Sequence, residues 1–290
     1  MSKRTVSISR RKFLKRVAWA TGATGLGCLY PAYIEPHHVQ VSRLRYAVPN
    51  LPYAWDGITI AHLTDLHRSA FVGLDYLNRC IDVANALHPQ LTIFTGDYIT
   101  HGLHFPHADI SVGNTPRFLG ECVRCMARAR APLGVLATLG NHDHWYNGDR
   151  VTAAIQSAGI PVLRNQNTRI TVNGEALSIV GLGDLCTEGV DLRRAFQGVD
   201  DPFSLVLTHN PDVFASWARP GAHLILAGHT HGGQVNLPFV GAPIVPSRYV
   251  RGFFRRGDST MYVNRGVGLI FPPVRFNCPP EIALIQLQRA

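Results

Sequence analysis

Five short apolar runs in this chain each end in a cluster of polar side chains. The runs span residues 58–63, 91–95, 134–138, 204–207 and 224–227, and each has the length and composition of a buried β-strand. The polar residues that follow them are Asp65 and His67, Asp97, Asn141 and His142, His209, and His229 and His231. Because sites in α/β sheets form at the carboxyl ends of strands, we expect these side chains to converge at one edge.

Between these runs the apolar spacing changes. Residues 74–87, 116–130 and 151–158 have helical spacing, so strands and helices alternate in the first half of the chain. Further strands are predicted at 41–48, 160–163, 261–263 and 282–288, and Asn173-Gly174 predicts a hairpin turn between strands at 169–172 and 177–180. Residues 237–256 are expected to form a loop. Helices early and hairpins late predict an α/β fold with mixed sheets rather than a parallel barrel.

Seven candidate ligands would meet at the predicted edge. They comprise three oxygen donors and four imidazoles: Asp65, Asp97, Asn141, His67, His209, His229 and His231. A single tetrahedral zinc needs only four ligands. Two divalent ions that share a carboxylate account for the larger set. Glycines directly before three of the clusters, at positions 96, 140 and 228, let the backbone come close to such ions.

The basic charge of the chain is concentrated at its start. The formal charge is +9, but residues 1–16 carry seven basic residues and no acid, which leaves 21 basic and 19 acidic residues in the rest. A specific nucleic-acid partner is therefore not expected. All lysines lie in residues 1–16, which excludes Schiff-base chemistry and a phosphate-loop lysine in the globular part. Cys122 and Cys125 form a single pair at helical spacing, which favours buried core thiols over zinc, with a disulfide left open.

Residues 9–15, Ser-Arg-Arg-Lys-Phe-Leu-Lys, resemble a twin-arginine export signal, and an uncharged stretch follows from residue 17 to 34. We therefore divide the chain into a signal segment and linker, 1–40, and a domain, 41–290. Such a signal implies the twin-arginine machinery as a partner and a periplasmic location or one on the outer face of the cytoplasmic membrane. Cleavage, lipidation near Cys28 and retention as an anchor remain alternatives.

The polar clusters occur as Asp-x-His, Gly-Asp, Gly-Asn-His-Asp, His-Asn-Pro and Gly-His-Thr-His, in order from Asp65 to His231. This series resembles the five motifs of the calcineurin-like metallophosphoesterases. Residues 232–234, 265–268 and 273–281 resemble the exported bacterial phosphodiesterases of the YaeI and YkuE type. The resemblance implies a layered sandwich of two mixed β-sheets flanked by helices, with a dinuclear metal site at the carboxyl ends of the strands.

The resemblance also implies a role for each residue. One ion would be held by Asp65, His67, Asp97 and His231, and the second by Asp97, Asn141, His209 and His229. The ions would be two of Mn, Fe or Zn. As catalytic residues, His142 would stand beside the leaving oxygen and Asp143 would orient it. Asn141 would also face the substrate. Arg265 is the expected substrate-binding arginine, because its planar fork matches phosphate.

These features predict a phosphoester hydrolase that uses a metal-bridging hydroxide as the nucleophile. The leading hypothesis is a phosphodiesterase. Its substrate would be a small-molecule or lipid-linked phosphoester. A pyrophosphatase acting on a nucleotide-linked lipid such as UDP-2,3-diacylglucosamine is the narrower alternative, and a non-catalytic metal-binding scaffold is the other. Aromatic residues and arginines mix in residues 237–254. That segment predicts either a wall for a lipid-linked substrate at a membrane surface or a loop folded onto the core.

Overall fold

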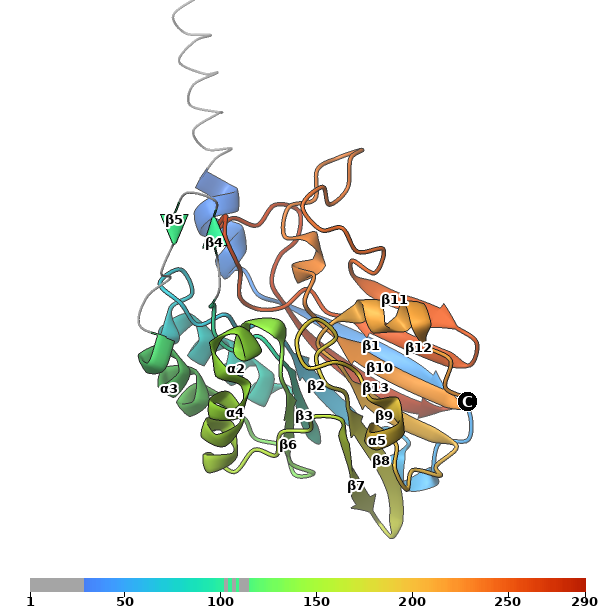
Figure 1. Ribbon diagram of the computed structural model, residues 1–290. Coiled ribbons are helices and arrows are strands. Elements are labelled where there is room, and N and C mark those ends of the chain that lie inside the picture. The colour runs from blue at the N-terminus through green and yellow to red at the C-terminus, as the bar shows by residue number, and fades with distance from the viewer. Residues whose placement is uncertain (1–28, 102–103, 106–107, 110–114) are drawn as a thin grey trace, which may run out of the picture.

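Two mixed β-sheets stack face to face at the centre of the molecule, with helices on their outer faces (Figure 1). The computed structural model describes residues 29–101, 104–105, 108–109 and 115–290. The predicted α/β fold with two mixed sheets is confirmed. The expected signal sequence up to residue 28 lies outside the described residues.

The first sheet has the strand order β1-β13-β2-β3-β6. Its strands are β1 (Gln40–Val48), β13 (Glu281–Arg289), β2 (Thr59–Leu63), β3 (Leu91–Thr95) and β6 (Val135–Thr138). Only the pair β13 and β2 is antiparallel. Because β2, β3 and β6 run parallel, their carboxyl ends meet at one edge, which brings the first three polar clusters together.

The second sheet has the strand order β11-β12-β10-β9-β8-β7. Its strands are β11 (Gly252–Arg256), β12 (Ser259–Val263), β10 (Ala222–Ala227), β9 (Phe203–Leu207), β8 (Glu175–Gly181) and β7 (Gln166–Val172). The central strands β8, β9, β10 and β12 are parallel, and an antiparallel strand closes each edge. The predicted hairpin turn at Asn173-Gly174 joins β7 and β8, and both of its residues have positive φ.

Three apolar clusters hold the layers together. Ile60, Ile93, Leu205, Leu224 and Ile285 belong to the cluster between the two sheets. Helices α2 (Leu74–Ala86), α3 (Thr115–Met126) and α4 (Asn141–Ser157) cover the outer face of the first sheet, and α5 (Leu192–Ala195) and η4 (Pro211–Ser216) cover that of the second. Strands buried on both faces need no polar alternation, which explains why the runs read as continuously apolar.

The residues before β1 pack against the C-terminal part of the chain. They form η1 (Tyr30–Ile34) and η2 (Glu35–His37). The buried Glu35 carboxylate accepts the backbone N–H groups of Asn277 and Cys278. The Arg275 N–H donates to the Pro31 carbonyl at 2.8 Å. The segment assigned to a linker is thus attached to the domain from residue 30 onward.

Several local predictions differ from the structure. Helix α4 begins at Asn141, ten residues before the predicted start, because the Gly140 N–H and the Asp143 carboxylate form a cap there. Residues 160–163 make one bridge, between Val162 and Ala137, instead of a strand. Part of the predicted loop 237–256 is strand β11.

The remaining short elements are η3 (Tyr53–Trp55), η5 (His231–Gly233), β4 (His104–Phe105) and β5 (Ala108–Asp109). Cys122 and Cys125 are buried free thiols in α3. In the described residues, no helix combines the length and the apolar character that a membrane span requires.

Candidate metal centre

The expected ligands come from five loops at one edge of the two sheets. Asp65 and His67 follow β2, Asp97 follows β3, Asn141 begins α4, His209 follows β9, and His229 and His231 follow β10. Five of these residues have a left-handed backbone, with φ of 53° for Asp65, 47° for His67, 55° for Asp97, 71° for His229 and 51° for His231. That conformation costs a non-glycine residue about 1–2 kcal/mol. Such strain gathered at one place marks a functional site.

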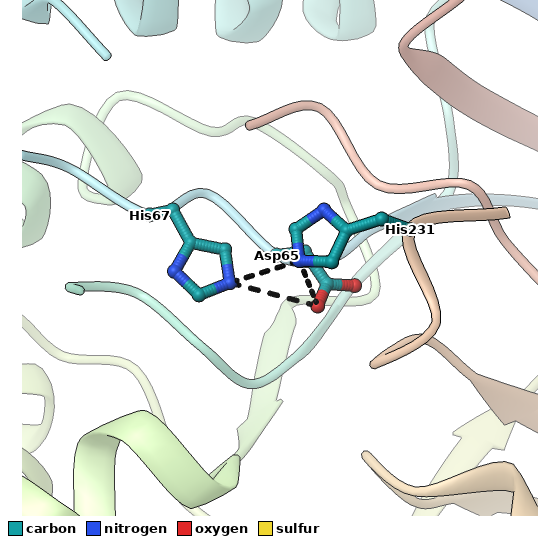
Figure 2. A group of neighbouring side chains, drawn as sticks. All are labelled: Asp65, His67 and His231. Carbon is teal, nitrogen blue, oxygen red and sulfur yellow. Dashed lines mark hydrogen bonds and ion pairs between the residues drawn. The ribbon is translucent and has the colours of Figure 1, made fainter. Parts of the chain in front are cut away.

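Asp65, His67 and His231 form the first cluster, and Figure 2 shows their side chains pointing toward one another. The Nε2 atoms of His67 and His231 lie 3.1 Å apart. Asp65 Oδ1 lies 3.9 Å from His67 Nε2 and 3.5 Å from His231 Nε2. All three residues are buried. Three donor atoms therefore face a common point between the end of β2 and the end of β10.

Asp97 connects this cluster to a second one, formed with His209 and His229. Asp97 Oδ2 lies 3.4 Å from His67 Nε2 and 3.1 Å from His209 Nε2. His209 Nε2 is in turn 3.1 Å from His229 Nδ1. One carboxylate oxygen thus faces both clusters, which is the geometry that a bridging ligand needs.

The contacts of His209 and Asn141 show whether these residues fit a cation. The Nδ1 of His209 donates to the Thr95 carbonyl at 2.8 Å, so Nε2 is the nitrogen directed at the cluster. Nε2 lies 3.1 Å from Asp97 Oδ2, a pair that is stable only with a cation between the two atoms, either a proton or a metal ion. The buried Asn141 Oδ1 has no hydrogen-bond partner within the described part of the chain. Imidazole nitrogens with carboxylate and amide oxygens suit Mn, Fe or Zn, so the residues fit two divalent ions.

Glycines allow the ligand loops to touch. A Cβ at Gly140 would collide with the Asp97 carboxylate, and one at Gly228 would collide with Thr64 and the Asp65 carboxylate. The His229 N–H donates to Asp65 Oδ2 at 3.0 Å, and the His142 N–H donates to Asp97 Oδ1 at 2.9 Å. Backbone groups of one loop therefore hold the carboxylates of another.

The ionisation of the site follows from burial and from the close charges. Burial alone would raise the pKa of Asp97, but His209 and His142 outweigh it and hold that pKa well below its usual value. Burial would lower the pKa of His209, yet Asp97 raises it well above the usual value. Burial lowers the pKa of His142 to about 4. The protein thus presents an ionised Asp97 together with a neutral His142.

The structure corrects the role expected for Asp143. Its carboxylate accepts the backbone N–H groups of Asp97 at 2.8 Å, Tyr98 at 3.0 Å and Gly140 at 2.9 Å. The Nδ1 of His142 instead contacts the backbone of His101, at 2.5 Å from its carbonyl oxygen and 3.2 Å from its nitrogen. As the third residue of α4, Asp143 reaches back to the start of its own helix rather than to His142. Asp143 therefore positions the Asp97 loop, and the backbone of His101 orients His142.

Arg265, the arginine expected to bind substrate, is directed elsewhere. Its Nε lies 3.2 Å from the Glu281 carboxylate, and its backbone N–H donates to the same carboxylate at 3.0 Å. Glu281 begins β13 and is buried, so the pair ties the loop after β12 to the first sheet. Arg265 is not among the residues that line the cavity over the ligands. Asn141, the other expected substrate contact, does line it.

Arg275 has a role that sequence reasoning missed. The side chain is fully buried, and its guanidinium donates to the carbonyls of Arg265, Gly266, Gly268, His231 and Cys278. The Gly268 N–H donates to the Asp65 carbonyl at 2.7 Å. Arg275 thus fixes loops that carry His231 and support Asp65. The residues next to Arg275 in the sequence do not predict this role, because four of the five carbonyls lie in other loops.

A cavity of about 430 Å³ opens over the ligands. Its polar side includes Asp97, Asn141, His142, His229 and His231. Its apolar side includes Trp145, Ile244, Val245, Ile270 and Phe271. A substrate that reaches the ligands therefore contacts an apolar wall, part of which comes from the segment 237–254.

Comparisons with known proteins agree with this geometry. Residues 58–233 match the family model described as calcineurin-like phosphoesterase. The chain is 33% identical to the metallophosphoesterase YkuE of Bacillus subtilis over 97% of this chain and 98% of that protein. It is 35% identical to the phosphodiesterase YaeI of Escherichia coli over 97% of this chain and 99% of that protein. It is 25% identical to the UDP-2,3-diacylglucosamine pyrophosphatase LpxG of Chlamydia trachomatis, over 88% and 91% respectively.

Proposed function

The chain belongs to the calcineurin-like phosphoesterase family and is a metal-dependent phosphoester hydrolase, and we propose that its substrates are phosphodiesters. The main observation behind the catalytic site is the position of Asp97 Oδ2, which lies 3.4 Å from His67 Nε2 and 3.1 Å from His209 Nε2. A carboxylate shared in this way serves two divalent ions at once.

The proposed ligands divide between two ions. Asp65, His67 and His231 would hold one with Asp97, and Asn141, His209 and His229 would hold the other with Asp97. When bound, the two ions supply a hydroxide nucleophile near neutral pH and offset the charge of the phosphate. Asn141 and His142, which line the cavity, would orient the ester against that nucleophile.

His142 has a separate role in this proposal. It lines the cavity, and its Nδ1 contacts the backbone N–H and carbonyl of His101. When the Nδ1 of the neutral imidazole accepts the His101 N–H, the proton lies on the opposite nitrogen, which can donate it to the leaving oxygen. Its ring centroid lies 4.8 Å from that of His67 and 4.6 Å from that of Trp145, so the packed rings hold it over the ligands.

The choice of a phosphodiester rests on the nearly full-length similarity to YaeI, whose name gives that activity. Hydrolysis of a nucleotide-linked lipid is the second candidate, since the chain is also similar to the pyrophosphatase LpxG and the cavity has an apolar wall. Export from the cytoplasm, where such a nucleotide-linked lipid is made, favours the first candidate.

We further propose export through the twin-arginine machinery to the periplasm or the outer face of the cytoplasmic membrane. The support is the run Arg10-Arg11-Lys12-Phe13-Leu14 ahead of an uncharged stretch. Replacing Arg10 and Arg11 with lysine should leave the protein in the cytoplasmic fraction after cell fractionation. Unchanged export of that variant would contradict this route.

An assay panel tests the activity. The protein, reconstituted with Mn or Zn, is offered bis-nitrophenyl phosphate, mono-nitrophenyl phosphate and UDP-2,3-diacylglucosamine. We expect turnover of the diester to exceed that of the other two. Asp97→Ala should lose both metals and at least about a hundredfold in activity, because it removes a ligand from each ion. The exposed Asp82→Ala serves as the matched control.

Highest turnover of the nucleotide-linked lipid would favour the pyrophosphatase instead. Absence of hydrolysis from the whole panel, with both metals bound, would leave the chain as a metal-binding scaffold. An Asp97→Ala protein that keeps two metals would contradict the bridging assignment.

A further inference from the structure

Exposed apolar side chains gather in three segments of the molecule. Fourteen large apolar side chains are exposed in the described residues, and nine of them lie in residues 29–34, in residues 237–244 or at Phe271. We name these nine the apolar face: Leu29, Tyr30, Tyr33, Ile34, Leu237, Phe239, Val240, Ile244 and Phe271. Exposed apolar side chains grouped on neighbouring segments mark an interaction site.

The three segments are joined through backbone hydrogen bonds. The Arg275 N–H donates to the Pro31 carbonyl, and the Asn236 N–H donates to the Phe276 carbonyl, each at 2.8 Å. Residues 275–276 thus lie between η1 and the segment that leads into residues 237–244. Figure 1 shows η1 and the orange loop after η5 extending from the same end of the molecule.

The tip of the loop at residues 237–244 holds its side chains away from the core. A turn closed by the Leu237 N–H and the Gly241 carbonyl, 2.8 Å apart, carries Phe239 and Val240 at its end. Phe239 has a φ of 65° and is fully exposed, and Val240 is 68% exposed. A strained backbone that presents a phenylalanine to the outside has no role in folding, so its role is sought in a partner.

Charge identifies the partner. Residues 237–257 contain four arginines and no acid, and the only acid in residues 29–39 is the buried Glu35. Anionic lipid headgroups attract such basic segments. Tyrosines such as Tyr30 and Tyr33 favour the boundary between lipid and water.

The apolar face also borders the metal-centre cavity. Ile244 and Phe271 belong to the face and line the cavity, whose other side carries His142 and His229. We propose that the apolar face inserts shallowly into an anionic phospholipid bilayer and presents the cavity to phosphoesters held at the lipid surface. The second half of this statement rests on the proposed hydrolase function, and the first half does not.

Fluorescence quenching tests the docking. The full chain carrying Asp97→Ala, which removes turnover, is mixed with phosphatidylglycerol vesicles that contain brominated lipid. Tryptophan placed by Phe239→Trp should be quenched above the level of the parent protein. Tyr53→Trp is the matched control, since Tyr53 is 73% exposed outside the face, and it should show no added quenching. Equal quenching at both positions, or none at Phe239→Trp, overturns the proposal.

Measurements of vesicle binding and of activity separate the docking of the apolar face from the presentation of the cavity. Phe239→Ser combined with Val240→Ser should weaken vesicle binding about tenfold, because binding scales with buried apolar area. Turnover of soluble bis-nitrophenyl phosphate should stay unchanged, while turnover of a vesicle-borne phosphodiester falls. Equal loss on both substrates overturns presentation at the membrane. Light scattering without lipid could instead show that the parent protein is a dimer and that this variant is a monomer. That result would assign the apolar face to contact with a second copy of the chain.

Discussion

At the level of single residues, the site is built from backbone conformations that side chains other than glycine rarely adopt. Asp65, Asp97 and His231 are left-handed, and each lies directly after or close to the end of a buried strand. That conformation turns the chain sharply, so that the side chain points back over the sheet edge. The surrounding loops must hold this strain, which the N–H groups bound to the Asp65, Asp97 and Asp143 carboxylates accomplish.

His142→Ala should retain both metals and lose turnover by about a hundredfold or more, because no residue then bonds the leaving oxygen. The loss should be larger for an alkyl leaving group than for nitrophenolate, which departs without a proton. Metal analysis and kcat on both ester types measure this, with the exposed His88→Ala as control. A metal-loaded His142→Ala protein with unchanged kcat on every substrate would show that His142 does not assist the leaving group.

At the level of elements, the strand ends from the two sheets approach so closely that only glycine fits between them. Gly228 directly follows β10 of the second sheet and lies against Thr64 and Asp65, which follow β2 in the first sheet. Gly140 has the same relation to Asp97 within the first sheet. These contacts, rather than the ligands alone, set the spacing of the two clusters.

Gly228→Ala should therefore separate the β2 and β10 loops, since its methyl group would collide with the Asp65 carboxylate. We expect a loss of about 1–3 kcal/mol in unfolding free energy and weaker binding of the first ion. Gly73→Ala is the matched control, because no atom lies within 4 Å of its added Cβ. Denaturant unfolding and metal titration measure both effects. Equal behaviour of the two variants would refute the close-packing argument.

The loops behind the ligands depend on Arg275. Arg275→Lys keeps the charge but loses the planar fork, so several buried carbonyls lose their donor. We expect a loss of at least about 2 kcal/mol in unfolding free energy, together with weaker metal binding through His231 and Asp65. Arg251→Lys, at an exposed position that donates to the Asn277 carbonyl, provides the comparison. Full stability with normal metal affinity in Arg275→Lys would show that the carbonyls find other donors.

At the level of the whole molecule, the proposed ions join the two sheets. Each cluster draws ligands from both: Asp65 and His67 with His231 in one, and Asp97 with His209 and His229 in the other. The apolar layer between the sheets holds the strands together along their length, and the ions would hold the sheets together at one end. Metal binding and domain stability are therefore expected to be linked.

Removal of metal by a chelator should lower Tm reversibly. An ion present at a hundred times its Kd adds about 2.7 kcal/mol to the free energy of unfolding. For a domain of this size, two ions then correspond to a Tm change of roughly 10–20 °C. Calorimetry with and without chelator, followed by addition of Mn or Zn, measures the change. Chelator should leave the Tm of Asp97→Ala unchanged, and an equal drop in that variant would contradict the link.

The strands and the metal-binding character of the site are readable in the sequence because both have local causes. A buried strand must be apolar on both faces, and a ligand loop must place Asp or His directly after it, so residues 58–67, 91–97 and 224–231 show the pattern without tertiary information. The glycines at positions 140 and 228 could be recognised for the same reason, since a close approach excludes every larger side chain.

The partners of individual side chains were decided only by the tertiary structure. Asp143 caps its own helix, Arg265 pairs with Glu281, and Arg275 binds carbonyls from other loops. The choice among such partners depends on which loops the packed sheets bring within about 3 Å, the length of a hydrogen bond. The apolar face beside the cavity likewise exists only because hydrogen bonds of residues 275–276 bring η1 next to the loop at 237–244, which are some 200 residues apart in the chain.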